Sequence, residues 1–154
     1  MQSDMRRFRR ARDEARVSLS KMTEKVGTLK QQLEEKARAA EKAVMRGDSL
    51  GPLHGVPVSI KDLLDVKGVP TRHGSAIFAD NPPAASDDIT VARLRAAGAI
   101  VFAKANSPEF GVKGLTDGPS FGTTRNPWNL ERTPGGSSGG GAAAVAAGLG
   151  GPQA

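Results

Sequence analysis

A run of glycine and serine near the end of the chain constrains the fold more than any other stretch of the sequence. Residues 133–141 read Thr-Pro-Gly-Gly-Ser-Ser-Gly-Gly-Gly, and an alanine-rich stretch follows up to Gly148. Glycine allows backbone conformations closed to other residues, alanine is the best helix former, and a glycine commonly ends a helix. We therefore predict a tight loop that leads into a helix over residues 138–148. Such a junction presents unpaired N–H groups that can bind an anion or a serine hydroxyl. A flexible linker is the alternative, although a linker does not normally end in a helix.

Two strands and a helix are predicted upstream of this loop. Residues 56–60 and 99–103 are rich in β-branched and apolar side chains, which is typical of a short strand and of a fully buried strand, respectively. Between them, Asp88 and its neighbours can cap a helix over residues 87–97, which Gly98 would end. A strand–helix–strand order is typical of α/β layers. The predicted fold class is therefore α/β.

The N-terminal part of the chain is predicted to be helical and basic. Apolar residues recur at spacings of three and four between residues 15 and 44, which indicates a long amphipathic helix. The helix could pair as a coiled coil, but its apolar stripe weakens to alanine, so packing across the domain's sheet is the simpler interpretation. Four arginines precede it: Arg6, Arg7, Arg9 and Arg10. They could bind nucleic acid or an anionic surface, yet no nucleic-acid motif follows, so a solvated helix face is favoured.

Composition argues against several classes of site. The chain of 154 residues has no cysteine and two histidines, so we expect no disulfide, no thiol nucleophile, no metal site and no cofactor. No apolar run approaches the ~20 residues that cross a bilayer, and the N-terminus lacks the apolar stretch of a signal peptide. We therefore expect a soluble, cytoplasmic protein. Its core should consist of Val, Ile, Leu and Ala, and the single tryptophan, Trp128, is interpreted as a packing residue.

Four segments resemble, in the same order, the motifs of the amidase signature family. They are Gly-Val-Pro-Val-Ser-Ile-Lys-Asp at residues 55–62, residues 96–110, residues 120–129, and the Gly-Gly-Ser-Ser-Gly-Gly loop. The resemblance covers roughly residues 36–150 and implies the N-terminal part of the family's α/β/α layered fold, here preceded by the long amphipathic helix. We accordingly expect a basic amphipathic helical segment over residues 1–35 and a partial amidase domain over residues 36–154.

The resemblance also implies a reaction and the residues that carry it out. Members of the family hydrolyse carboxamides to carboxylates and ammonia through a Ser–Ser–Lys triad. In this triad a neutral lysine acts as general base through a bridging serine that is held by a cis peptide bond. Lys61 matches the lysine and Ser137 matches the bridging serine, while Gly136 and Ser138 are expected to contact the substrate. Without the resemblance, a lysine at a strand end is more simply a surface residue whose ammonium reaches water.

One element of the family pattern does not occur in this sequence. The attacking serine of the family lies farther along the chain than the bridging serine, in a Gly-Thr-Asp-x-Gly-Gly-Ser segment whose amides form the oxyanion hole. No such segment follows Ser137 here. We therefore expect a truncated amidase that is inactive by itself.

Three functions are open on the sequence alone. The chain could belong to a hydrolase of small-molecule amides, to the amidase subunit of a glutamyl-tRNA amidotransferase, or to a non-catalytic remnant or interaction module built on the N-terminal helix. In each case we expect no direct contact with nucleic acid and none with a membrane. Apolar surface exposed by truncation should favour self-association, so a homo-oligomer is among the expected states.

Overall fold

The computed structural model describes residue 20, residues 27–28 and residues 30–149. Residues 30–46 are helical, which confirms the later part of the predicted amphipathic helix. The four arginines and most of the predicted helix before residue 30 lie outside the described residues. The chain divides into two compact units between Lys42 and Ala43, and the elements described below belong to the second unit. No helix of the described residues is both long and apolar enough to cross a membrane.

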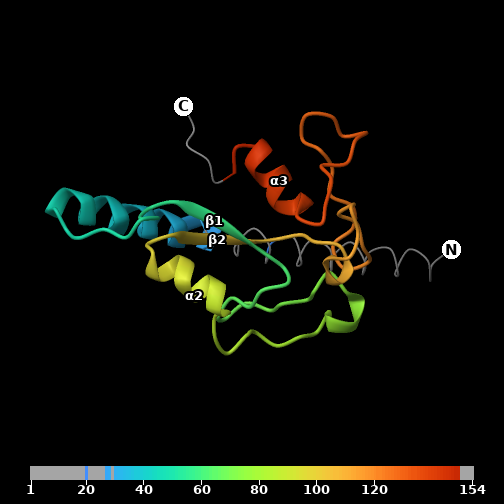
Figure 1. The fold of residues 1–154 in the computed structure, drawn as a ribbon, viewed down its shortest axis with the longest axis horizontal. Helices are drawn as coiled ribbons and strands as arrows, with labels where there is room; N and C mark the ends of the chain where they lie inside the picture. Colours follow the sequence, from blue (N-terminus) through green and yellow to red (C-terminus); the bar gives the residue numbers. More distant parts are fainter. Residues whose placement is uncertain (1–19, 21–26, 29, 150–154) are drawn as a thin grey trace, which may run out of the picture. The chain divides into compact units, whose positions relative to one another are not determined.

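The second unit is organised around two parallel strands (Figure 1). Strand β1 spans Pro57–Lys61 and strand β2 spans Ile100–Ala105. Pro57 pairs with Ile100 and Lys61 with Ala105, and an irregularity after Val58 leaves one extra residue on β2. Both predicted strands are therefore confirmed: each begins one residue later than expected, and the two share one sheet.

Helix α2, which spans Ile89–Ala96, connects the two strands. Its cap is Asp88, whose side chain accepts a hydrogen bond from the Thr90 N–H at 2.8 Å. Beyond its end stands Gly98, whose φ of +94° lies in the left-handed region. A Cβ at Gly98 would lie 2.8 Å from the Cα of His54, so this turn requires glycine. The predicted cap and the predicted end of this helix are both confirmed.

The core of the unit lies between α2 and the strands. It consists of aliphatic side chains, as composition predicts: Ile60, Val66, Val91 and Val101, with Val58, Leu64 and Leu94 packed against them. Two alternate residues of β1 belong to this core, and the intervening Ser59 and Lys61 face the other side because side chains alternate along a strand.

Helix α3, which spans Gly139–Ala146, covers that other side. It contacts both strands, and a Cβ added at Gly141 would lie 3.6 Å from Ser59 Oγ. Figure 1 shows α2 and α3 on opposite sides of the strands, which is the α/β/α layering expected for an α/β fold. The alternation of β1 thus sends Lys61 into the layer that contains the start of α3.

Two expectations about packing are wrong. Trp128 is 82% exposed, because a tight turn holds it at the surface. In this turn the backbone N–H of Trp128 donates to Asn126 Oδ1 at 2.9 Å. Strand β2 is not fully buried either, since Val101 is buried and its other residues are half-buried. The sheet has two strands in the described part of the chain, so β2 is covered by a neighbouring strand along one edge.

Candidate active site

Lys61 is the last residue of β1 and extends toward the start of α3. Within the described residues, its Nζ makes one hydrogen bond, in which it donates to Ser137 Oγ at 2.6 Å. The two residues are 76 positions apart in the sequence. The predicted approach of Lys61 and Ser137 is therefore confirmed. It depends on the parallel strands and on α3 packing against them.

Ser137 lies in the tight loop that directly precedes α3. The Gly136–Ser137 peptide bond is cis, as the family resemblance implies. Gly135 has a φ of +85°, and its N–H donates to Thr133 Oγ1 at 3.0 Å, so the entry to the loop is a compact turn. The loop and the helix predicted for residues 138–148 are confirmed, with Gly148 in the left-handed conformation that ends α3.

The backbone of a short 3-10 turn, η2, borders this pair. It spans Glu109–Gly111, and a Cβ added at Gly111 would lie 3.7 Å from Lys61 Nζ and 4.0 Å from Ser137 Oγ. The same Cβ would lie 2.8 Å from Leu63 Cδ1, and φ at this position is +70°, so glycine lets the turn pack closely against Leu63 and the two polar atoms. An aromatic cluster adjoins the turn, with ring centroids 5.2 to 6.3 Å apart: His73, Phe78 and Phe110. The sequence analysis missed both the turn and the cluster.

The two residues expected to contact a substrate lie on either side of Ser137. Both Gly136 and Ser138 are exposed. Gly136 packs against residues 114–115, where an added Cβ would lie 2.9 Å from the Gly114 carbonyl carbon. Ser138 precedes α3, and its side chain makes no capping hydrogen bond to that helix. Contact of either residue with a substrate stays a prediction.

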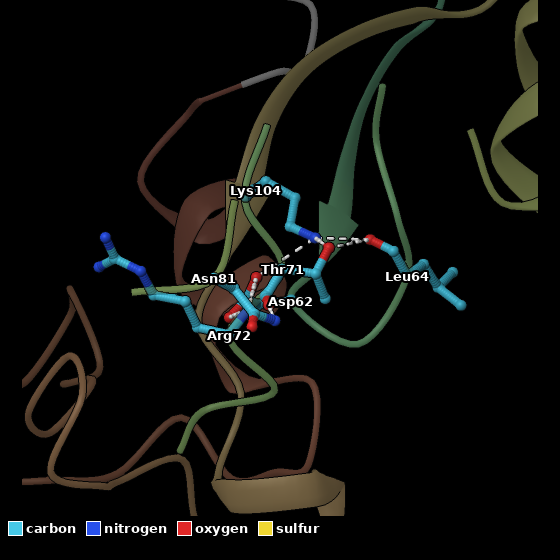
Figure 2. A network of polar contacts seen from close by, with 6 residues as sticks. All are labelled: Asp62, Leu64, Thr71, Arg72, Asn81 and Lys104. Carbon is cyan, nitrogen blue, oxygen red and sulfur yellow. Dashed lines mark hydrogen bonds and ion pairs between the residues drawn. The ribbon is translucent and has the colours of Figure 1, made fainter. Parts of the chain in front are cut away.

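A buried polar network that the sequence analysis missed lies at the carboxyl ends of the two strands (Figure 2). Asp62, the residue after Lys61, is 3% exposed, and its carboxylate forms an ion pair with Lys104 Nζ of β2 at 3.2 Å. The same carboxylate accepts a hydrogen bond from the backbone N–H of Arg72, at 3.2 and 3.3 Å from its two oxygens. Lys104 also donates to Thr71 Oγ1 at 3.0 Å. These bonds tie β1, β2 and the intervening loop together next to Lys61.

The network determines which cation binds the carboxylate next to Lys61, and the sequence contains a pattern that predicts it. Because Lys104 pairs with Asp62, the carboxylate beside Lys61 in the sequence is bound to a different cation. The carboxyl ends of parallel strands lie at the same edge of a sheet. The predicted strands 56–60 and 99–103 are followed by Lys61 and Lys104, respectively, and Asp62 comes directly after Lys61. That combination predicts an ion pair at the edge.

The start of α3 fits closely against the end of β2. The Gly140 N–H donates to the Asn106 carbonyl oxygen at 3.2 Å, and a Cβ at Gly140 would lie 2.4 Å from the Asn106 nitrogen. We expect Gly140→Ala to destabilise the fold by about 1–3 kcal/mol, because backbone must move to admit the methyl group. Chemical denaturation monitored by circular dichroism would measure this.

The neighbouring glycine provides the control. A Cβ at Gly141 would make an ordinary contact at 3.6 Å from Ser59 Oγ. Gly141→Ala is therefore expected to stabilise the helix by up to about 1 kcal/mol, the propensity difference between the two residues. Equal effects of the two substitutions would contradict the close packing of Gly140 on Asn106.

Comparisons with known proteins identify the family. The model of the Amidase family matches residues 13–151 of this chain. The protein AmiB2 of Mycobacterium bovis, a putative amidase by name, is 54% identical over 113 residues, which are 73% of this chain and 24% of that protein. A glutamyl-tRNA(Gln) amidotransferase subunit of Moorella thermoacetica is 52% identical over 121 residues, which are 79% of this chain and 24% of that protein.

A solved structure agrees with the sequence relatives. The structure of 6-aminohexanoate cyclic dimer hydrolase matches with a TM-score of 0.63 and 40% identity over 75% of this chain and 23% of that chain. The chain thus spans about a quarter of the length of the relatives it matches. Since the family match extends over most of the sequence, the chain belongs to the amidase signature family.

Proposed function

We propose that this protein acts in the hydrolysis of small-molecule amides, with Lys61 and Ser137 transferring the proton that the reaction requires. The observation that supports this proposal most is the 2.6 Å contact between Lys61 Nζ and Ser137 Oγ. A candidate base must lie within hydrogen-bond reach of the group it deprotonates, and this pair does.

The proposed chemistry uses the pair as a proton relay. Lys61 Nζ accepts the hydroxyl proton of Ser137, while Ser137 Oγ accepts the proton of the attacking hydroxyl group. The nucleophile then bonds to the amide carbon, and the C–N bond breaks when the proton on Lys61 returns through Ser137 to the leaving nitrogen. Water then attacks the acyl carbon, the bond to the nucleophile breaks, and the carboxylate is released. Lys61 and Ser137 together take up one proton from the nucleophile and give one proton to the leaving nitrogen, so their protonation is unchanged at the end. Gly136 and Ser138, which flank Ser137 and are exposed, are proposed to contact the bound amide.

The attacking serine is not among the residues of this sequence, as the family resemblance indicates. We therefore expect a polypeptide of residues 1–154 alone to release no ammonia from simple aliphatic or aryl amides above the buffer rate. Loss of even one oxyanion donor lowers turnover by about 10²–10³-fold, and here the attacking group is lacking as well. Ammonia release measured with and without Lys61→Ala would check this. Sustained turnover that the substitution abolishes would point to Ser138 as the nucleophile.

A chimera tests the proposed function directly. Residues 43–149 of this chain would replace the matching segment of 6-aminohexanoate cyclic dimer hydrolase, which supplies the rest of the fold. We expect the chimera to hydrolyse the cyclic dimer, and the host without the segment to show no turnover. A chimera that folds, by circular dichroism and a cooperative unfolding transition, but does not hydrolyse the dimer would contradict the proposal.

A second candidate function rests on the 52% identity to the Moorella amidotransferase protein. In that case the same relay would release ammonia for a partner protein. The same segment placed in the Moorella protein would then support its activity. The two candidates differ in which host the segment restores.

A further inference from the structure

A buried threonine joins the two sides of the loop that carries Ser137. Thr116 lies between η2 and α3 and is 1% exposed. Its hydroxyl donates to the Gly135 carbonyl oxygen at 3.1 Å and accepts the Gly139 N–H at 2.9 Å. One hydroxyl group therefore bridges the residue two positions before Ser137 and the residue two positions after it.

The packing around this bridge leaves little room for movement. A Cβ at Gly139 would lie 2.3 Å from Thr116 Oγ1, and a Cβ at Gly136 would lie 2.9 Å from the Gly114 carbonyl carbon. Thr116 itself is fixed, because its carbonyl oxygen accepts the Thr124 N–H at 2.9 Å. The segment 114–116 thus contacts the loop on both sides of Ser137, at positions where only glycine fits.

Few other side chains hold this loop. In the described part of the chain, two side chains from outside residues 133–141 make hydrogen bonds to the loop or to the first residue of α3, and these are Lys61 and Thr116. Lys61 binds the Ser137 hydroxyl, and Thr116 binds the backbone on either side of it. The position of Ser137 Oγ relative to Lys61 Nζ therefore depends on where Thr116 holds the loop.

We propose that Thr116 is a positioning residue that holds Ser137 at hydrogen-bond distance from Lys61. Its role in a reaction rests on the proposed function, but its effect on the Lys61–Ser137 contact does not. A threonine that only capped α3 would alter the stability of the fold and leave the surroundings of Lys61 unchanged. The test therefore measures Lys61 itself and involves no turnover.

The test compares the chemical reactivity of Lys61 among variants of the full chain. Acetic anhydride at a series of pH values would acylate the lysines, and peptide mass spectrometry would give the rate at Lys61 relative to the exposed Lys67 in the same sample. Thr116→Val removes the hydroxyl and keeps the shape, whereas Thr116→Ser keeps the hydroxyl. Thr123→Val is the matched control, because Thr123 is exposed in the same loop region.

We expect Thr116→Val to change the relative rate at Lys61 by about 2- to 10-fold, the size expected for one lost hydrogen bond. Its pH profile should match that of Ser137→Ala, and the double variant should match either single variant, because both act on one contact. Thr116→Ser and Thr123→Val should keep the unmodified profile. A Thr116→Val profile equal to that of the unmodified chain, an additive double variant, or failure of Thr116→Ser to restore the profile would each overturn the proposal.

A second measurement on the unmodified chain does not depend on how any variant folds. The first amides of a helix have no partner within the helix and normally exchange quickly with solvent. Because the Gly139 N–H is bonded to Thr116, we expect its hydrogen exchange to be slower than in an unstructured peptide of the same sequence. An unprotected Gly139 amide in the folded chain would overturn the proposal, whatever the Thr116 variants do.

Discussion

Replacing Lys61 by alanine in the chimeric hydrolase is expected to lower kcat by about 10²–10⁴-fold, the usual contribution of a positioned general base. The reason is the 2.6 Å contact with Ser137, which is the hydrogen bond that Lys61 Nζ makes within the described residues. The proposed relay uses no other group to accept this proton, so no neighbouring side chain should replace the lysine. Steady-state hydrolysis of the cyclic dimer at several pH values would measure the loss.

Ser137→Ala should cause a loss of similar size, and the double variant should lose little more than either single variant, because residues of one relay act as a unit. Lys67→Ala is the matched control: it removes an exposed lysine six positions away and should leave kcat within a factor of about two. Retention of near-normal turnover by Lys61→Ala would remove this lysine from the mechanism. Additive losses from Lys61→Ala and Ser137→Ala would show that the two residues act separately.

The largest expected effect on stability comes from the buried ion pair in Figure 2. We expect Lys104→Met to reduce the free energy of unfolding by about 3–5 kcal/mol, the usual cost of breaking a buried pair from one side. The Lys104 and Asp62 side chains are 14% and 5% exposed, so the remaining carboxylate would have little access to water. The substitution also removes the hydrogen bonds from Lys104 Nζ to Thr71 Oγ1 and to the Leu64 carbonyl oxygen, which connect β2 to the loop that follows β1. Urea unfolding of the full chain would measure the change.

Two comparisons isolate the uncompensated charge as the cause. The double variant Asp62→Asn, Lys104→Met removes both charges and should recover most of the lost stability, because replacing both members of a buried pair is often nearly neutral. Lys113→Met breaks an exposed pair with Asp117, in which the side chains are 53% and 40% exposed, and should cost less than about 1 kcal/mol. If Lys104→Met cost no more than Lys113→Met, the network would not anchor the strand ends.

Most of the secondary structure follows from local chemistry and could be predicted from the sequence. The branched residues of β1 and β2, the Asp88 cap, and the turns at Gly98 and Gly148 act within a few residues of themselves, so each leaves a local pattern. The α/β layering of β1, α2 and β2 was expected because a helix separates two apolar strands. The approach of Lys61 to Ser137 was expected from the family resemblance and not from any spacing between them.

Tertiary structure alone decided which polar groups surround that pair. The hydroxyl of Thr116 and the backbone at Gly111 reach their partners across loops, and the polar atoms of irregular backbone have no fixed sequence spacing to their partners. The sequence by itself therefore determined the layers and the identity of the two candidate catalytic residues. The contacts that hold those residues in place required the folded chain, because they depend on how separate segments pack.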